Sequence, residues 1–469
     1  MYLHYPIAIS KQNNNFNKEL KNIIEITDTI NLRITKYSLL KVLIKQGFGY
    51  MPIMHHDKSL FKANLIERWN IMKHFYPYLR EDGFSDEKMN RLLLTYLNRI
   101  DGNITDEFTE TNAGERLKTY FYVLKEFMAN FKDGHLIEYG EIQGTTKMGV
   151  TQYRENHPLI ALDYVEDTVV SKFDLEGKNL YTGETERIKR GDKLVSVNNI
   201  PIDSLLSIKL KYITSSNDEE KREQFLRGDG FSTLSKDSLF SFVFESSKGN
   251  YIEFDNNVAN QSWGKVLERY AEKKNFINNL GNGVYYIDFS SEKLKEKTFK
   301  EFLSSHMDSI KKLIFELREY PMPEAANILS YLSEKTIQWG NYKIPIRYFP
   351  NQELEEWEGD ETIPPKYPYL KGIPCYVLIG INTISYGESI ANTLKKNKLA
   401  TLIGTNSSGI NGDMSYINQS VFDYSMSVGK DLDGYHSVGV PPDIYVKQTL
   451  DDYRKGKDTV FEYVKKLCK

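Results

Sequence analysis

The stretch CYVLIGINTISYGESIANTLKK, residues 375–396, decides the fold of this chain. Its apolar run Cys375–Ile381 predicts a buried strand, and the residues after the turn predict a helix. Ser385 lies at the turn, where a hydroxyl can be exposed beside converging backbone N–H groups and the positive end of a helix. Such a serine can act as a nucleophile. The alternative interpretation is an ordinary N-cap serine in a Ser-x-x-Glu capping box with Glu388.

Strands and helices alternate on both sides of this stretch. From about residue 265, the segments GVYYIDFS, LIFELRE and LATLIGTN predict strands, while KTFKEFLSSHMDSIKKL and ANILSYLSEK predict helices. Because strands and helices take turns, we expect an α/β layer built from βαβ units. Upstream, residues 58–131 predict helices, with Pro77 ending the first and Ser85 capping the second. Short strands such as TVVSKF and LFSFVFE predict a β-rich module from about residue 140 to 258.

Composition narrows the class of protein. The chain has 469 residues and a net charge of −3, so it lacks the excess of positive charge that binding nucleic acid requires. No apolar run approaches the roughly 18 residues that span a bilayer, and the N-terminus has no basic segment typical of a signal peptide. We therefore expect no membrane span and no signal peptide in this chain, and its location stays open: cytoplasmic, or exported with the leader removed. Two cysteines, Cys375 and Cys468, cannot build a disulfide framework.

Three further segments carry candidate site residues. His135 follows a glycine turn in FKDGHL and could be a general base near neutral pH. The loop GTNSSGINGD, residues 404–413, lacks the ending of a phosphate-binding loop, and His436 precedes a rigid Gly-Val-Pro-Pro turn. The alternatives are surface loop histidines and a flexible loop. The eight histidines show no spacing typical of a metal site, so we expect neither a metal nor a cofactor.

The order of these segments resembles the S41 family of serine peptidases, the C-terminal processing and tricorn-core-like group. The resemblance covers about residues 58–469: RWNIMKHFYPYL resembles the helical start, RGDKLVSVNNIPID a PDZ-like strand and turn, NTISYGESIA the nucleophile segment, and HSVGVPPDIYV the closing element. It implies an α/β (crotonase/ClpP-like) catalytic domain with an N-terminal helical bundle and a small PDZ-like β-rich domain. The expected boundaries are 1–57 (lead-in), 58–138 (helical cap), 139–258 (PDZ-like) and 259–469 (peptidase).

The resemblance also implies roles for individual residues. Ser385 would be the nucleophile, His135 the base and the Tyr386 N–H an oxyanion donor, while His436 stands near the place of the family's glutamate. We expect Gly387, Gly409, Asn411 and Gly412 to bind substrate. The partner would be a peptide or protein, held by the PDZ-like module.

The chain also departs from the family's pattern. The processing branch has a lysine about 25 residues after the serine, where this chain has Ile410, so the histidine of the tricorn-like branch is the expected base. That branch has a serine before the histidine, where Gly134 stands, so the group that orients His135 is left open. The family's oxyanion glycines are replaced by Glu319-Tyr320-Pro321, and proline has no N–H to donate.

Two functions from different classes follow, with a third less favoured. The first is a serine-type peptidase that captures an extended or C-terminal peptide. The second is an S41-like peptide-binding protein with weakened or lost catalysis, which the missing glycines favour. The third function is acyl-CoA chemistry on the related crotonase-like fold. It is less favoured because the sequence has no clear signal of a basic nucleotide pocket. Substrate, cleavage preference and oligomeric state are not indicated by the sequence.

Overall fold

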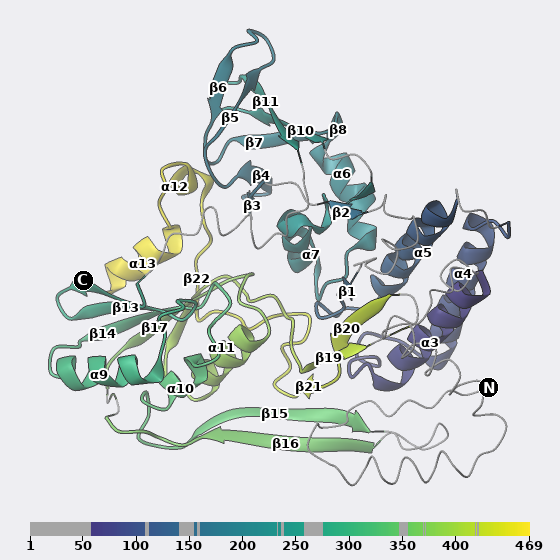
Figure 1. Cartoon of the computed structure of the whole chain (residues 1–469). Coiled ribbons are helices and arrows are strands. Elements are labelled where there is room, and N and C mark those ends of the chain that lie inside the picture. Colours follow the sequence, from purple (N-terminus) through teal and green to yellow (C-terminus); the bar gives the residue numbers. More distant parts are fainter. Residues whose placement is uncertain are drawn as a thin grey trace, which may run out of the picture.

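Figure 1 shows the whole chain as a computed structural model. The structure describes residues 58–107, 112–139, 154–156, 160–231, 233–235, 239–257, 275–346, 355–368, 370, 372–417, 419 and 422–469. The predicted lead-in, residues 1–57, lies outside the described residues. The predicted domain boundary at residue 258 also falls on residues that are not described.

Three helices form the N-terminal unit, as the sequence predicts: α3 (Lys58–Phe75), α4 (Asp86–Asn103) and α5 (Ala113–Met128). The first ends before Pro77, and the second begins where the Ser85 hydroxyl accepts a hydrogen bond from the Lys88 N–H. Their apolar core also contains residues from far down the chain, including Ile417, Phe422 and Tyr424.

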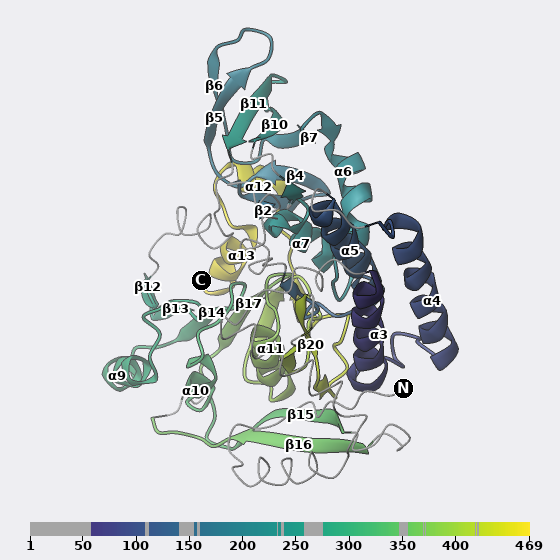
Figure 2. The same cartoon turned by 45° about the vertical axis from the view of Figure 1, so that its right-hand side comes forward.

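Those distant residues belong to a small sheet that packs on the helices (Figures 1 and 2). Its strands are β1 (Glu138–Tyr139), β20 (Asp423–Ser427) and β19 (Met414–Ile417), in the order β1-β20-β19. The β1–β20 register places Glu138 opposite Tyr424. This pairing brings the segment around His135 beside a strand almost 300 positions later in the sequence, which no local pattern indicates.

The β-rich module stands at the top of Figure 1. Its sheet has the order β3-β4-β7-β10-β11-β5-β6, with β8 paired to β7, and two helices accompany it. The elements are β3 (Leu162–Val165), β4 (Thr168–Ser171), β5 (Leu175–Asn179), β6 (Thr185–Ile188), β7 (Lys193–Val197), β8 (Ile200–Pro201), α6 (Ile202–Lys209), α7 (Asp218–Gln224), β10 (Leu239–Glu245) and β11 (Tyr251–Asn257). The predicted turn Asn198-Asn199 is confirmed, with φ of 50° and 63°. A PDZ-like identity for this module stays a prediction.

The C-terminal part is the expected α/β layer. Its sheet has the order β12-β13-β14-β17-β18-β22, antiparallel between the first two strands and parallel elsewhere. The strands are β12 (Ile277–Gly281), β13 (Val284–Asp288), β14 (Lys312–Glu316), β17 (Cys375–Ile379), β18 (Thr401–Gly404) and β22 (Ile444–Tyr445). The helices are α9 (Glu296–His306), α10 (Ala325–Leu329), α11 (Tyr386–Lys396), α12 (Leu450–Arg454) and α13 (Thr459–Leu467), and α10 is shorter than the sequence predicts.

Residues that alternate along these strands bury both faces of the sheet. Ile287, Phe315 and Val377 pack in the same core as α9, α10 and α11, while Ile314 and Leu378 pack against α13. Because both faces are covered, the central strands read as continuous apolar runs. The long hairpin β15 (Ile337–Ile346) and β16 (Glu355–Ile363), which pairs with β21 (Lys430–Asp431), runs below α11 in Figure 1. The sequence analysis did not predict this hairpin.

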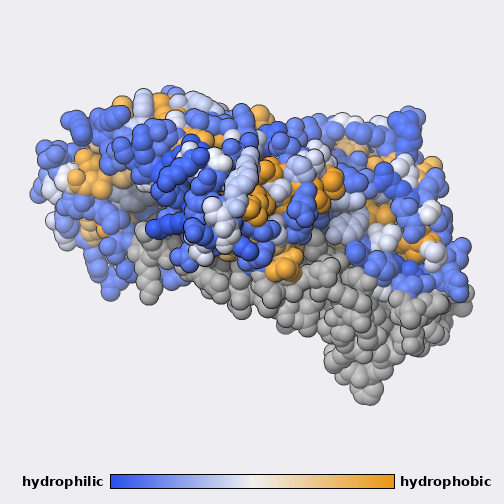
Figure 3. All heavy atoms as spheres, turned by 90° about the horizontal axis from the view of Figure 1, so that it is seen from above, coloured by the Kyte–Doolittle hydropathy of each residue, from blue (hydrophilic) through white to orange (hydrophobic). Residues whose placement is uncertain are grey.

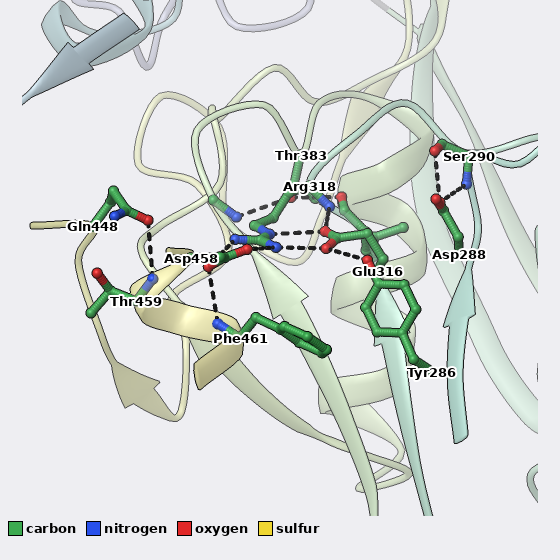
Figure 4. Close-up of polar contacts among 12 residues, drawn as sticks. Tyr286, Asp288, Ser290, Glu316, Arg318, Thr383, Gln448, Asp458, Thr459 and Phe461 are labelled. Atoms are coloured by element: carbon green, nitrogen blue, oxygen red, sulfur yellow. Dashed lines mark hydrogen bonds and ion pairs between the residues drawn. The ribbon is translucent and has the colours of Figure 1, made fainter. Parts of the chain in front are cut away.

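Arg318 joins the carboxyl end of the sheet to the last helix (Figure 4). Its guanidinium donates to both oxygens of Glu316, with Nε–Oε1 of 2.9 Å, and to both oxygens of Asp458, with Nη1–Oδ1 of 3.0 Å. Asp458 is also the N-cap of α13 and accepts from the Phe461 N–H. A planar guanidinium can satisfy two carboxylates at once because its donors form a rigid fork.

The face seen from above is mainly hydrophilic where the structure describes it (Figure 3). Seen from above (Figure 3), polar and charged residues cover most of this face, and apolar residues form small groups among them. Among the described helices, none combines the length and the hydropathy that crossing a bilayer would require.

We expect Arg318→Met to lower the free energy of unfolding by about 3–5 kcal/mol, because it leaves the buried Glu316 carboxylate without its cation. Chemical denaturation measures this change. The control is Lys297→Met, which removes an exposed ion pair with Glu301 and should change stability by less than about 1 kcal/mol. Equal effects of the two substitutions would contradict a special role for Arg318.

Candidate active site

Ser385 lies between the apolar strand β17 and the helix α11, as the sequence predicts, and its backbone is strained. Its φ is 48° and its ψ is −111°, a conformation that residues with a side chain rarely adopt. Its N–H donates to the Ile410 carbonyl at 3.1 Å. The hydroxyl makes no capping bond to the first turn of α11, so the interpretation of Ser385 as an ordinary N-cap is wrong.

The Ser385 hydroxyl instead meets His135. The distance between Ser385 Oγ and His135 Nε2 is 3.0 Å, although the residues are 250 positions apart. His135 is 6% exposed, so it is not a surface loop histidine. Its backbone N–H donates to Asp133 Oδ1 and its carbonyl accepts from the Ser425 hydroxyl. The loop that carries the imidazole is therefore fixed at both backbone groups.

A serine from β20 contacts the other imidazole nitrogen. Ser427 Oγ lies 2.9 Å from His135 Nδ1 and donates to Asp133 Oδ1 at 2.8 Å. The Ser427 N–H donates to Asp133 Oδ2, also at 2.8 Å. The four side chains Ser385, His135, Ser427 and Asp133 thus form one continuous line of hydrogen bonds. Neither Asp133 nor Ser427 was among the site residues predicted from the sequence.

Burial lowers the pKa of His135, and the negative charges of Asp133 and Asp413 oppose that shift. The imidazole is therefore mainly neutral at pH 7. A neutral imidazole has one nitrogen that can accept a proton, which a general base requires.

Glu388, three residues after Ser385, holds the glycine-rich loop behind the site. It is fully buried, and its Oε1 accepts from the Ser407 hydroxyl and from the Gly409 N–H. The Ser407 hydroxyl accepts in turn from the Val440 N–H at 2.6 Å. Burial raises the pKa of Glu388 to about 7, although the hydrogen bonds it accepts act in the opposite direction.

Tyr386 fixes the loop between β14 and α10, which contains Glu319-Tyr320-Pro321. Its hydroxyl donates to the Pro323 carbonyl at 2.9 Å and accepts from the Ala326 N–H at 3.0 Å. The Met322 N–H in the same loop donates to the Phe289 carbonyl. Because the Met322 N–H already donates this hydrogen bond, it is not available as the second oxyanion donor. The role of the Tyr386 N–H as the first donor stays a prediction.

Most of the predicted substrate-binding residues lie in tightly packed backbone. A Cβ on Gly409 or Gly412 would come within 2.9 and 2.0 Å of the backbone of Ser437 and Gly429, and these glycines have φ of 77° and 107°. A Cβ on Gly387 would make only ordinary contacts, at 3.4 Å or more. Asn411 is 4% exposed, and its Nδ2 has no hydrogen-bond partner within the described ranges. The glycine-rich loop is therefore not a flexible surface loop in this region. Contact with substrate stays a prediction for all four residues.

His436 lies against the helical unit. Its ring stacks on Tyr78 at 3.6 Å between ring centroids, and its Nε2 is 3.3 Å from Asp82 Oδ1. These contacts join the loop before β22 to the segment before α4. A catalytic role for His436 stays a prediction, and its contacts do not include the line of four side chains.

The β-rich module reaches into the site through one segment. Ser216 Oγ accepts from the Gly134 N–H at 3.3 Å, Asn217 Nδ2 donates to the Ser408 carbonyl at 2.7 Å, and Arg227 donates to Asn382. The module thus contacts the loops that carry His135, Ser385 and the glycines.

Between module and sheet lies a cavity of about 370 Å³. Its walls come from β3, α7 and the carboxyl ends of the parallel strands, and they include Tyr164, Arg222, Glu223, Asn382, Thr405 and Lys447. Asn382 is three residues before Ser385, so one end of this cavity adjoins the nucleophile loop.

We expect Glu388→Gln to flatten the pH dependence of stability. The folded-state pKa of Glu388 is raised, so its stabilising contribution is complete below the unfolded pKa of about 4.5 and is lost as the pH rises through about 7. Between pH 4.5 and pH 8, wild type should therefore lose up to about 3 kcal/mol more than the variant. Denaturation at both pH values measures the difference. Parallel curves for the two proteins would contradict the raised pKa.

Comparisons with known proteins agree with this architecture. Residues 284–446 match the family model of peptidase family S41. Mature CPAF in complex with lactacystin superposes with a TM-score of 0.63 at 11% sequence identity, covering 87% of this chain and 97% of that one. Mature CPAF alone gives a TM-score of 0.62 at 12% identity, covering 87% of this chain and 96% of that one. The photosystem II D1 C-terminal processing protease gives 0.43 at 12%, covering 82% and 93%. No curated protein sequence matches. The fold of CPAF is thus shared along most of the chain, and residues 284–446 are similar to peptidase family S41.

Proposed function

We propose that this protein is a serine peptidase in which Ser385 is the nucleophile and His135 the general base. The observation that carries the proposal is the 3.0 Å distance between Ser385 Oγ and His135 Nε2. The strained backbone of Ser385 supports it, because strain of this kind is retained where the surrounding structure holds a side chain for function. The base is a histidine rather than the lysine of the processing branch, in agreement with the absence of a lysine near Ile410 in the sequence.

The reaction would proceed by acyl transfer. Ser385 Oγ attacks the carbonyl carbon of the scissile bond while His135 Nε2 takes the hydroxyl proton. The carbonyl oxygen becomes negative and lies near the N-terminus of α11, where the Tyr386 N–H is the first candidate donor. Nε2 then gives its proton to the leaving amine nitrogen, and the C–N bond breaks. Water, activated by the same nitrogen, hydrolyses the acyl-serine and restores both residues.

The edge strand β3 is the best candidate to hold an extended peptide. The two-residue turn Glu166-Asp167 has φ of 47° and 60°, so the flanking pair Val165 and Thr168 exchanges hydrogen bonds. Antiparallel pairs alternate, and Tyr164, one residue earlier, therefore directs its backbone N–H and C=O away from β4. Those groups can pair with an added strand.

The cavity supports this assignment. Tyr164 from β3 and Arg222 from α7 line one side, and Asn382 from the nucleophile loop lines the other. A peptide added to β3 would thus run between the module and the catalytic sheet. Its backbone would be recognised at the strand edge, and its continuation would reach the loop that carries Ser385.

We expect a fluorophosphonate probe to label wild type covalently and to leave Ser385→Ala unlabelled, because the probe reacts with an activated serine hydroxyl. The matched control is Ser389→Ala, one turn further along α11, whose hydroxyl faces the Ser385 carbonyl and not His135. It should keep labelling within a few-fold of wild type. Mass spectrometry of the labelled peptide identifies the site.

If Ser385→Ala is labelled as fast as wild type, the nucleophile assignment is wrong. The second candidate function, a peptide-binding protein with weakened catalysis, is motivated by Glu319-Tyr320-Pro321 in place of the oxyanion glycines. Peptide binding without labelling of wild type would select it.

We expect Tyr164→Pro to weaken peptide binding about 5- to 10-fold more than Tyr164→Ala. Both variants lose the ring, but only proline loses the backbone N–H, and an edge strand tolerates proline. Fluorescence anisotropy with a pool of random extended peptides, free or amidated at the C-terminus, measures binding in the Ser385→Ala background. Equal binding by the two variants would show that β3 is not the docking strand.

A further inference from the structure

We propose that Ser427 and Asp133 are positioning residues, and that the Ser427 hydroxyl bridges the Asp133 carboxylate to the His135 ring. In the family's pattern a serine precedes the histidine, whereas this chain has Gly134 there. The inference rests on the proposed function of Ser385 and His135 and names the groups that the sequence left open. Ser427 touches the imidazole, and Asp133 acts through Ser427.

The distances show that the carboxylate does not hold the imidazole directly. His135 Nδ1 is 3.8 Å from Asp133 Oδ1, beyond hydrogen-bond reach, but 2.9 Å from Ser427 Oγ. Ser427 Oγ is 2.8 Å from Asp133 Oδ1. The hydroxyl therefore fills the step between base and carboxylate.

The inventory of donors and acceptors then determines the tautomer. An ionised Asp133 can only accept, and a hydroxyl has a single hydrogen, so Ser427 donates that hydrogen to Asp133. Ser427 Oγ must consequently accept from His135, which places the imidazole hydrogen on Nδ1. Nε2 is left with a lone pair directed at the Ser385 hydroxyl, as a general base requires.

Asp133 is placed to stabilise the imidazolium that forms when Nε2 takes the proton. Its carboxylate is 2% exposed and accepts three hydrogen bonds, from Ser427 Oγ, the Ser427 N–H and the His135 N–H. The negative charge of Asp413 also raises the pKa of the ring. Because both charges favour the protonated imidazole, removing the charge of Asp133 should move the acidic limb of the reaction to lower pH.

A matched control lies on the same strand. Ser425, two residues before Ser427, is equally buried and donates its hydroxyl to the His135 carbonyl rather than to the ring. Ser425→Ala and Ser427→Ala therefore remove the same group from the same strand, and only the second leaves Nδ1–H without its acceptor. A purely structural role would give both substitutions similar effects.

The test compares rates of fluorophosphonate labelling from pH 5 to pH 9. We expect Ser427→Ala to slow labelling by about 10²–10³-fold, less than the roughly 10⁴-fold measured when a directly bonded triad aspartate is replaced in another protease. Ser427→Thr, which keeps the hydroxyl, should stay within about 10-fold of wild type, and so should Ser425→Ala. In Asp133→Asn the acidic limb should move to lower pH.

A second measurement does not depend on the labelling reaction. It therefore tests the relay even if a variant folds poorly or the proposed peptidase function is wrong. Two-bond ¹H–¹⁵N spectra of histidine-labelled protein, assigned against His135→Ala, report which ring nitrogen carries the hydrogen. We expect the Nδ1–H form in wild type and Ser427→Thr, and its loss in Ser427→Ala. Absence of labelling in wild type would reject the peptidase alone. Wild-type labelling rates in Ser427→Ala, equal losses in Ser425→Ala, or an Nε2–H tautomer in wild type would each overturn the relay.

Discussion

The buried carboxylate of Asp133 is the interaction on which the site depends. A carboxylate removed from water is stable only when hydrogen bonds replace its hydration, and Asp133 accepts three, all from His135 and Ser427. Those bonds join the end of the helical unit to β20. If β20 shifted by one residue, the Ser427 side chain would move to the opposite face and the charge would lose two donors. The cost of that loss fixes the register, and the register places His135 against Ser385.

The β-rich module contributes to the same assembly. The segment from Ser216 to Arg227 forms side-chain hydrogen bonds with the loop of the base, the glycine-rich loop and the nucleophile loop. Asn217 does so while its own Oδ1 caps α7 through the Glu220 N–H. The position of the module therefore affects the shape of the site, since the residues on both sides of α7 contact three separate loops.

Local pattern was enough to predict the α/β layer and the position of Ser385, because an apolar strand followed by an amphipathic helix is encoded within one short segment. His135 came from the resemblance, since a histidine after a glycine turn is weak evidence alone. Ser427 was missed because its contact spans 292 positions and depends on the β1–β20 pairing. A signal was present in the strand DYSMS, where Ser425 and Ser427 alternate with Met426: hydroxyls placed in a buried strand need partners.

The loop between β14 and α10 is held in a different way from the loop that carries His135. Where the family has glycines, this chain has a loop with proline, and a proline fixes φ and removes a donor. The Tyr386 hydroxyl restrains the same loop further, because it donates to the Pro323 carbonyl and accepts from the Ala326 N–H. Tyr386 thus makes two kinds of contact: its N–H lies at the N-terminus of α11, and its hydroxyl holds the loop between β14 and α10. If Ser385 is the nucleophile, as we propose, a rigid loop would lose little reorganisation energy when charge develops on the substrate.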